Sequence, residues 1–323
     1  MKISVVVPTY KRLNDLNRCL TALDNQVALP HEVIVVVKSY DPETLSFVMG
    51  WTSEQTLYRR QVCSVASYGV VRAMIEGVKF ASGEVVAFTD DDSAPEATWL
   101  QKMEHHYRNQ KVGGVGGRDI LVDRPVVPLE TTVGKLTWYG KLIGNHHLGE
   151  GPPREVDVLK GVNMSFRKEL VEFSPFLRGG GGPPETHNEV GLCLRVRHLG
   201  YSLVYDPEVK VNHYASPRID ADRNQFNAKF VKNSAFNLQM SLLTWIPWYQ
   251  KFLRVLYSTL VGDTGYPGFI RLLAAVARSE GVVVRSFFPV QFGFLIALMH
   301  CCRWTFQPML SQRRRLGQST RRV

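Results

Sequence analysis

The stretch Glu84-Val85-Val86-Ala87-Phe88-Thr89-Asp90-Asp91-Asp92 decides the fold of this chain. Its first part, Glu84 to Phe88, is apolar and β-branched, which is typical of a parallel strand buried on both faces. Three carboxylates then follow directly, and they repel one another and are costly to desolvate together. A divalent cation would neutralise them, since Mg²⁺ and Mn²⁺ take oxygen ligands from carboxylates and substrate phosphates. The alternative is a solvated acidic turn that caps a helix beginning near Pro95.

The segments around this stretch alternate between strand and helix patterns. Ile3 to Val7 and Glu32 to Val37 are β-branched runs, whereas Asn14 to Gln26 and Tyr68 to Phe80 have helical patterns. Such alternation with short connections predicts an α/β fold with a mainly parallel sheet flanked by helices. In open sheets of this kind, ligands bind beyond the carboxyl ends of the strands, which is where Asp90 to Asp92 fall.

No glycine-rich phosphate loop follows the first strand, either as a P-loop or as a Gly-x-Gly-x-x-Gly turn. The run Val112-Gly113-Gly114-Val115-Gly116-Gly117 comes too late for that role and indicates a tight strand crossing. Phosphates would therefore be held in another way, and a metal at the acidic triplet is the candidate.

Charge is distributed unevenly along the 323 residues, whose formal net charge is +10. Residues 216–323 contain 15 Lys and Arg against 4 Asp and Glu, so that a nearly neutral body carries a basic tail. A basic tail suits nucleic acid, and it suits an anionic membrane surface equally well. The length is sufficient for two domains, or for one large α/β domain with an appendage.

The cysteines and the N-terminus indicate a cytoplasmic catalytic body. A strand pattern begins at Ile3, without the n-region, h-region and cleavage site of a signal peptide. The cysteines are odd in number and lack the spacing of a metal site, so we expect reduced core residues. They are Cys19, Cys63, Cys193, Cys301 and Cys302.

Five stretches of the first 215 residues form a recognisable set. They are Val5-Val6-Val7-Pro8-Thr9-Tyr10, Ala81 to Asp92, Lys160-Gly161-Val162-Asn163-Met164-Ser165-Phe166-Arg167, Asn188-Glu189-Val190-Gly191-Leu192-Cys193-Leu194-Arg195, and Pro207 to His213. The set resembles the family 2 glycosyltransferases of the GT-A fold. The resemblance implies a catalytic domain over residues 1–215, with a nucleotide-sugar half (1–115) and an acceptor half (116–215).

The resemblance also implies a metal site and a donor site. Asp92 and His213 would be direct metal ligands, and a neutral imidazole beside a carboxylate suits Mn²⁺ better than Mg²⁺. Taken alone, His213 could be an ordinary histidine at a strand end, and Arg72 could be a surface arginine instead of a phosphate ligand. Asp90 would lie nearer the ribose. The full set of expected donor-binding residues is Pro8, Thr9, Tyr10, Asp41, Arg72, Asp90, Asp91 and Gly161.

Two departures from the family pattern bear on this site. Near the end of the second strand, where the family usually has an Asp that reads the nucleobase, this chain has Val37-Lys38-Ser39-Tyr40; the nearest acid is Asp41, so the base is left open. The family's Glu-Asp pair is Asn188-Glu189 here, which makes Glu189 the candidate general base. Its rivals are Glu185 and His187, and the alternative role of Glu189 is to complement the helix dipole.

The segment upstream of these residues, Gly179-Gly180-Gly181-Gly182-Pro183-Pro184, has little intrinsic order. It is interpreted as a mobile acceptor-side lid, and the alternative is a plain loop.

Residues 216–323 are expected to form a basic, apolar, helical region that associates with a membrane. Ser241 to Val261 has the pattern of one amphipathic interfacial helix, interrupted by Lys251 and Arg254. Ser286 to Cys302 is 17 residues long without a full charge, which favours a re-entrant or interfacial segment over a span. Arg313 to Arg315 and Arg321-Arg322 would then meet anionic headgroups. The alternative is a helical pair that packs on the catalytic body.

The sequence therefore predicts an inverting, hexosyltransferase-like enzyme that uses a nucleotide-diphosphate sugar and Mn²⁺ or Mg²⁺. The expected acceptor is a hydroxyl of a lipid-linked or cell-envelope glycan, as in polysaccharide biosynthesis, at the inner face of the membrane. Arg303-Trp304 has His300 where a processive synthase has Gln, so we expect a single transfer. The competing interpretations are a catalytically impaired sugar-nucleotide-binding scaffold and a nucleic-acid-binding protein. The second does not explain the acidic triplet and lacks a base-stacking motif.

Overall fold

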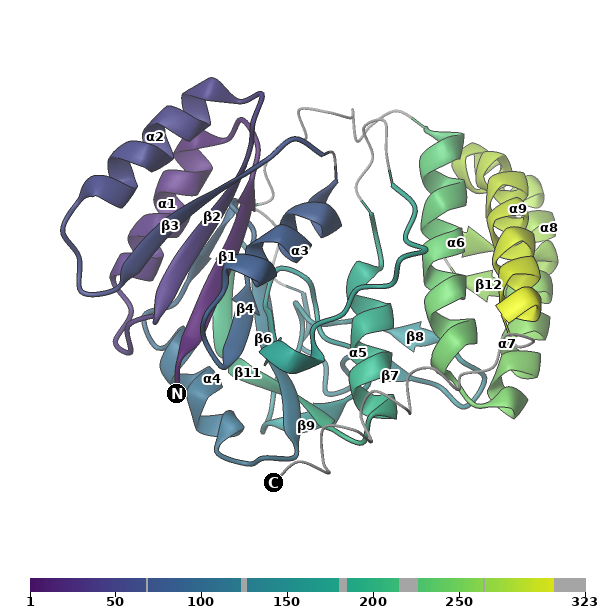
Figure 1. Ribbon diagram of the computed structural model, residues 1–323. Helices are drawn as coiled ribbons and strands as arrows, with labels where there is room; N and C mark the ends of the chain where they lie inside the picture. The colour runs from purple at the N-terminus through teal and green to yellow at the C-terminus, as the bar shows by residue number, and fades with distance from the viewer. Residues whose placement is uncertain (68, 123–126, 180–184, 215–225, 264, 305–323) are drawn as a thin grey trace.

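The computed structural model describes residues 1–304 except residues 68, 123–126, 180–184, 215–225 and 264. One large sheet lies between two layers of helices, and four C-terminal helices pack beside it (Figure 1). The expected α/β architecture with a helical extension is confirmed.

The first half of the sheet is parallel, as the sequence predicts. Its strands are ordered β3-β2-β1-β4, and Val5 pairs with Val33 on one side and with Ala87 on the other. Alternate residues of each strand face opposite helical layers, and both faces are apolar because both are covered. The strands are β1 (Ile3–Thr9), β2 (Glu32–Lys38), β3 (Arg59–Val65) and β4 (Val85–Phe88).

Helices cover both faces of this sheet. Leu16 of α1 and Trp99 of α4 pack with Val5 and Val33, whereas Met74 of α3 packs with Val6 on the opposite face. The helices on the first face are α1 (Leu13–Asp24), α2 (Pro42–Ser53) and α4 (Trp99–Tyr107). Those on the second are α3 (Val70–Phe80) and α5 (Asn188–His198).

The second half of the sheet is mixed. β10 (Met164–Arg167) is antiparallel to both β4 and β6 (Val112–Leu121), and β11 (Ser202–His213) runs parallel to β6. β5 (Ser93–Pro95) and β9 (Arg154–Val156) both pair antiparallel with β11. The expected division between residues 115 and 116 falls inside β6, so the two expected halves would share one sheet.

The glycine run expected at a tight strand crossing lies inside β6. A Cβ atom on Gly117 would stand 1.8 Å from the backbone oxygen of Val209 on β11, and one on Gly116 would stand 2.6 Å from that of Asn163. Glycine is needed here because neighbouring backbones approach one another closely. Smaller elements follow: β7 (Lys135–Leu136), β8 (Leu142–Ile143) and the 3₁₀ turn Lys168–Leu170.

The expectation of one amphipathic helix over Ser241 to Val261 is wrong. The segment contains the end of α6 (Ala228–Trp245) and the whole of α7 (Trp248–Leu260). Pro247 lacks the backbone N–H that would continue α6, so the chain turns there. Arg254 is also not available to headgroups: it is 1% exposed, donates to Gln239 and pairs with Asp263 at 3.4 Å.

The segment Ser286 to Cys302 lies within α9 (Gly281–Trp304), which packs on α6 through Ala297. A Cβ atom on Gly293 would stand 2.2 Å from the backbone oxygen of Lys232, so the two helices are in close contact. By length and composition, Gly281–Cys301 is the one helix among the described residues that could cross a membrane. The remaining elements are β12 (Gly262–Asp263), β13 (Tyr266–Pro267) and α8 (Phe269–Ala277).

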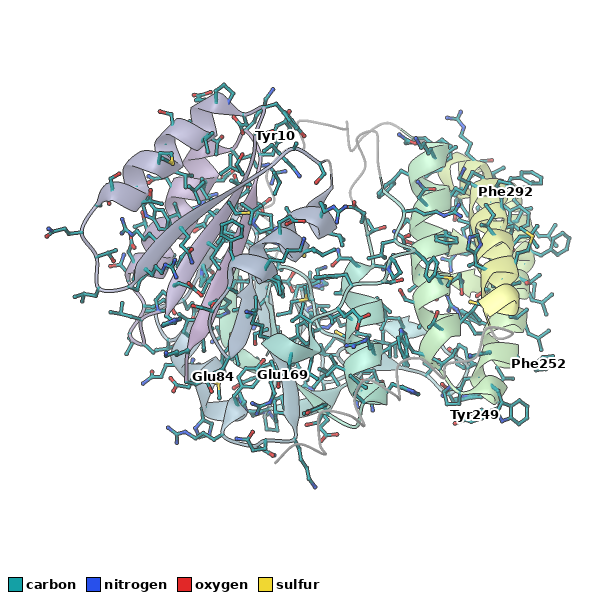
Figure 2. The ribbon with its side chains drawn as sticks, in the orientation of Figure 1. Tyr10, Glu84, Glu169, Tyr249, Phe252 and Phe292 are labelled. Atoms are coloured by element: carbon teal, nitrogen blue, oxygen red, sulfur yellow. The ribbon has the colours of Figure 1, made fainter. Side chains whose placement is uncertain are left out.

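One side of this helical group presents apolar side chains to solvent. Tyr249, Phe252 and Phe292 point outward (Figure 2), and Phe288 is 77% exposed. Because α8 packs against both α7 and α9, these side chains occupy neighbouring helices. We call the set the apolar face: Trp248, Tyr249, Phe252, Leu256, Leu260, Phe269, Ile270, Leu273, Val276, Phe288, Phe292, Leu295 and Met299.

The described cysteines are free thiols, as expected. Cys19, Cys63 and Cys193 are buried, and the sulfur of Cys301 lies 3.8 Å from that of Met240. The side chain of Cys302, Arg313 to Arg315 and Arg321-Arg322 lie outside the described part of the chain.

Candidate active site

The acidic triplet follows β4 at the carboxyl edge of the sheet, and its middle residue is bound to the end of β1. Thr9 Oγ1 donates to Asp91 Oδ2 at 2.9 Å, and Arg12 Nη1 donates to Asp91 Oδ1 at 2.9 Å. Arg12 also pairs with Asp92 at 3.3 Å. The carboxylate of Asp91 is thus committed to Thr9 and Arg12.

Strand pairing brings His213 to the same place, 121 positions along the chain from Asp92. β5 pairs with β11 so that His213 stands opposite Ser93, and the backbone N–H of Tyr214 donates to the backbone oxygen of Asp92 at 2.8 Å. His213 Nε2 lies 3.4 Å from Asp92 Oδ1. The potential ligand atoms of Asp90, Asp92 and His213 all lie within 4.8 Å of one another.

The alternative of an acidic turn that caps a helix near Pro95 is wrong. Ser93–Pro95 is a strand, and α4 begins only at Trp99. Its N-cap, Thr98, makes no side-chain cap hydrogen bond. The triplet therefore faces the sheet edge.

The pKa values show that burial and mutual repulsion of the carboxylates outweigh the nearby positive charges. Burial, followed by repulsion from Asp92, raises the pKa of Asp90 to about 6. Burial also raises the pKa of Asp91 to about 7, although Arg12 opposes the shift. Burial alone would lower the pKa of His213, but the carboxylates of Asp119 and Asp92 raise it to about 9. Each shift has the direction expected for crowded acids around one imidazole.

A buried carboxylate lies behind the imidazole. Asp119 of β6 is 2% exposed, and its Oδ2 atom lies 4.0 Å from His213 Nδ1. Asp119 Oδ1 and His213 Nδ1 are both buried without a hydrogen-bond partner among the described residues. Two carboxylates and an imidazole, with a further carboxylate facing the second ring nitrogen, fit a divalent cation.

Most of the expected donor-binding residues lie around this edge. Pro8 and Thr9 end β1, and the ring of Tyr10 meets that of Tyr40 edge-on with centroids 5.6 Å apart. Asp41 is buried, where it accepts from the backbone N–H groups of Lys11 and Thr44 as the N-cap of α2. Its carboxylate is thus occupied by backbone donors.

Two further expected donor-binding residues are less constrained. Arg72 is exposed in the first turn of α3. Gly161 lies in the turn between Lys160 and Asn163, where a Cβ atom would meet nothing within 4 Å. Lack of space within the protein therefore does not explain why residue 161 is a glycine.

The three candidates for the base differ in their bonding. Glu185 accepts from the backbone N–H of Val70 at 2.8 Å, at the start of α3. His187 Nε2 lies 2.6 Å from the hydroxyl of Tyr266. Glu189 stands half-buried in the first turn of α5, with no side-chain hydrogen bond or ion pair to any residue that the structure describes. Residues 180–184 of the expected lid lie outside the described residues.

Sequence reasoning missed Arg12, Asp119 and Lys160. The charge of Lys160 lowers the pKa of Asp90, Asp119 and His187, so it lies within electrostatic reach of the metal-type cluster and of the start of α5. Arg12 lies just after the end of β1 and the expected donor-binding residues Pro8, Thr9 and Tyr10. This position could have identified it as a site residue. Asp119 had no local signal, because only the pairing of β6 with β11 brings it to His213.

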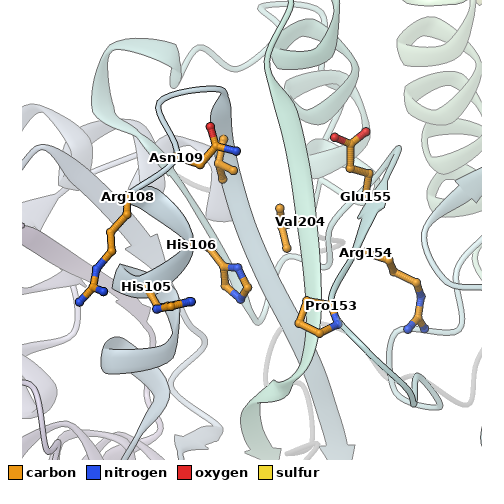
Figure 3. A pocket seen from close by; sticks show the side chains of 9 residues that line it. His105, His106, Arg108, Asn109, Pro153, Arg154, Glu155 and Val204 are labelled. Atoms are coloured by element: carbon orange, nitrogen blue, oxygen red, sulfur yellow. The ribbon is translucent and has the colours of Figure 1, made fainter.

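A cavity of about 450 Å³ lies elsewhere, between α4 and β9. Figure 3 shows Val204 between these elements, while the charged ends of Arg108, Arg154 and Glu155 point away from it. His106 is bound to Asp206 at 2.7 Å. None of the expected site residues lines this cavity.

Comparison with known proteins agrees with this geometry. Residues 4–147 match the model of Glycosyl transferase family 2. Over 223 residues the chain is 25% identical to the glucosyl-dolichyl phosphate glucuronosyltransferase of Haloferax volcanii, covering 66% of this chain and 69% of that protein. Over 181 residues it is 27% identical to the dolichol-phosphate mannosyltransferase of Pyrococcus furiosus, covering 53% and 48% of the two chains.

Among solved structures, a mannosyltransferase from Pyrobaculum calidifontis in complex with GDP-Man and Mn²⁺ is similar, with a TM-score of 0.56. The match covers 95% of this chain and 88% of that one at 18% identity, which shows a shared fold. Residues 4–147 thus match glycosyl transferase family 2, and the chain has the GT-A fold of these glycosyltransferases.

Proposed function

We propose that this glycosyltransferase is an inverting, metal-dependent, hexosyltransferase-like enzyme that makes a single transfer from a nucleotide-diphosphate sugar to an acceptor hydroxyl. The observation that carries the proposal is the convergence of Asp90, Asp92 and His213 beside the end of β1. That edge is where open α/β sheets bind their ligands. The relatives named above are transferases of sugars, and the similar solved structure contains GDP-Man and Mn²⁺.

Asp92 and His213 would hold the cation, with Asp90 beside the ribose. When bound, a divalent cation neutralises charge on the departing diphosphate. The mixture of carboxylate and imidazole favours Mn²⁺ over Mg²⁺, which prefers oxygen ligands. Arg12 and Lys160 bring positive charge to the same edge and would contact phosphate oxygens, as the exposed Arg72 would from α3.

Glu189 is the proposed base that takes the proton from the acceptor hydroxyl. Its rivals are engaged elsewhere: Glu185 with the start of α3, and His187 with Tyr266. Glu189 stands in the first turn of α5, where a negative side chain complements the helix dipole, so it can serve both roles. Positioned bases typically contribute about 10²–10⁴-fold in rate.

The acceptor is proposed to be a lipid-linked glycan at the inner membrane face. The apolar face contains large exposed side chains from three neighbouring helices. A patch of this kind indicates an interaction surface, whereas single exposed apolar residues do not. Lys251 and Arg285 lie on the same helices and suit anionic headgroups. The names of two relatives point to dolichol phosphate carriers, which supports a lipid-linked acceptor.

The proposal is tested by a donor screen with purified full-length protein. UDP-, GDP- and dTDP-sugars are titrated by calorimetry with Mn²⁺ and again with EDTA, and transfer is assayed to dolichyl phosphate and to a dolichyl phosphate monosaccharide in detergent. We expect one donor class to bind only with the metal and to be turned over. Equal donor affinity in EDTA would contradict the metal-bridged site.

Donor binding without turnover would instead favour the impaired scaffold. One observation bears on that alternative. Asn188, which replaces the family's acid, is 9% exposed and donates to the backbone oxygen of Glu185 at 2.9 Å. Its amide nitrogen is thus bonded within the protein, which supports Glu189 as the reactive residue.

A further inference from the structure

The C-terminal helices reach the start of α5 through a chain of short side-chain hydrogen bonds. Thr186 Oγ1 donates to Ser234 Oγ of α6 at 2.6 Å. Ser234 Oγ lies 2.6 Å from the hydroxyl of Tyr266 in β13, which in turn lies 2.6 Å from His187 Nε2. The chain begins and ends on the two residues that immediately precede Asn188-Glu189. The connection therefore joins residues beyond position 230 to the helix that carries the proposed base.

These bonds are compatible with a neutral imidazole at His187. With Thr186 donating to Ser234, one consistent arrangement has Ser234 donating to Tyr266 and Tyr266 donating to His187 Nε2. His187 is then neutral, with its ring proton on Nδ1. Desolvation also lowers the pKa of His187, although the nearby carboxylate of Glu189 opposes that shift.

The backbone at His187 needs support from its surroundings. Its φ of 60° and ψ of 23° are left-handed, which is uncommon for a residue with a side chain, and it makes no side-chain cap to α5. Such a conformation persists where neighbouring groups determine it. The hydroxyl of Tyr266 is the hydrogen-bond partner of its ring, and the two rings also meet with centroids 5.7 Å apart.

A second contact from α6 holds the same connection. Asn237 is 1% exposed, and its amide donates to the backbone oxygens of Arg178 and Thr186 while accepting from the backbone N–H of Arg178. On the neighbouring turn, a Cβ atom on Gly191 of α5 would stand 3.0 Å from Ser241 Oγ of α6. α6 therefore fixes both the approach to α5 and its first turns.

We propose that Tyr266 and Ser234 are positioning residues for the transfer reaction: they hold His187 in its left-handed conformation and thereby place Glu189 at the reacting hydroxyl. This inference rests on the proposed function, in which Glu189 is the base. It makes the C-terminal helical group part of the transferase site in addition to its membrane contact. Because Tyr266 lies between α7 and α8, the residue links the helices of the apolar face to the base.

The test compares Tyr266→Phe with Tyr257→Phe in the full chain. Both substitutions remove one hydroxyl from the same helical group, but Tyr257 donates to Asp263 and, among the described residues, makes no hydrogen bond to Thr186 or His187. For Tyr266→Phe we expect kcat to fall by about 10–100-fold, as for a displaced catalytic group, with donor KM within twofold of the unmodified enzyme. Tyr257→Phe should leave both values unchanged.

Two further readouts separate positioning from general stability. His187→Gln retains an acceptor for Tyr266 and should keep most of the turnover, whereas His187→Ala should match Tyr266→Phe. The double variant His187→Ala/Tyr266→Phe should lose no more than either single variant, because both remove one interaction. Independently of any substrate, hydrogen exchange of the 187–194 peptide should be faster in Tyr266→Phe and unchanged in Tyr257→Phe.

The outcomes distinguish this inference from the proposed function. If Glu189→Gln abolishes transfer while Tyr266→Phe stays within twofold of the unmodified enzyme, the positioning role is overturned and the base assignment stands. Equal losses in Tyr266→Phe and Tyr257→Phe would also overturn it, since they would indicate a general effect on the helical group. If Glu189→Gln transfers sugar normally, the proposed base is wrong and the inference falls with it.

Discussion

The strand-end region around Asp90 to Asp92 and the C-terminal helical group use apolar sequence in different ways. In β1, β2 and β4 the apolar residues are buried on both faces, and polar groups appear where each strand ends. In the C-terminal group, α6 is buried along Ser234 to Leu243, whereas α7, α8 and α9 leave one side exposed. Similar composition thus builds a core in one region and an outward apolar face in the other. The difference predicts chemistry at the strand ends and attachment at the helices, with Tyr266 joining the two.

The largest effect is expected for Glu189→Gln, which keeps the size and hydrogen bonding of the side chain but removes its basicity. Turnover should fall by about 10²–10⁴-fold, the range of a general base. Donor affinity should barely change, because the strand-end cluster is intact. Steady-state kinetics and calorimetry measure the two quantities. Should Glu185→Gln abolish transfer while Glu189→Gln does not, the base has been assigned one helical turn too far along.

Asp92→Asn tests the strand-end cluster itself. Removing a proposed ligand should weaken Mn²⁺-dependent donor binding by more than the roughly 10–100-fold typical of an outer-sphere change. The fold should persist, because the substitution relieves the repulsion that helps to raise the pKa of Asp90. Calorimetry with and without EDTA, together with thermal unfolding, gives both answers. Donor binding that remains sensitive to EDTA at the original affinity would exclude Asp92 as a ligand.

Asp119→Asn examines the carboxylate behind His213. Because Asp119 faces the second ring nitrogen, its loss should weaken Mn²⁺ affinity by about 10–100-fold. The conservative amide keeps the volume at this buried position, so unfolding temperature serves as the control for packing. Direct titration of the protein with Mn²⁺, followed by electron paramagnetic resonance, reports the affinity without an activity assay. An unchanged affinity would show that Asp119 does not contribute to metal binding through His213.

The smallest effect concerns the apolar face. Phe252→Ser should lower binding to anionic liposomes by about tenfold, since one large apolar side chain no longer enters the interface. Leu57→Ser is the matched control, because Leu57 is 90% exposed just before β3, far in sequence from the face. Flotation measures the bound fraction. Full-length protein that stays soluble with both anionic and neutral liposomes would show that the face meets another partner.

The sequence predicted the parallel strands well because a strand buried on both faces has a distinctive composition. Asp90 to Asp92 could be placed at the sheet edge from the run Glu84 to Phe88 alone. The C-terminal helices were harder, since an apolar helix looks the same whether it packs on protein or faces outward. Ser241 to Val261 was predicted as one helix for that reason, and Pro247 divides it. Arg254 likewise has the pattern of an interfacial cation but is buried against Gln239.

What the sequence determined by itself is local: strand cores, helix periodicity, and the chemistry of the residues that follow a strand. These depend on neighbours within a few positions, so periodicity and composition reveal them. Tertiary structure alone decided that Asp119 faces His213, that Arg12 holds Asp91, and that Tyr266 bonds to His187. Each of these pairs is brought together by strand pairing or helix packing across tens of residues. Such contacts form only in the folded structure, so no local pattern along the sequence predicts them.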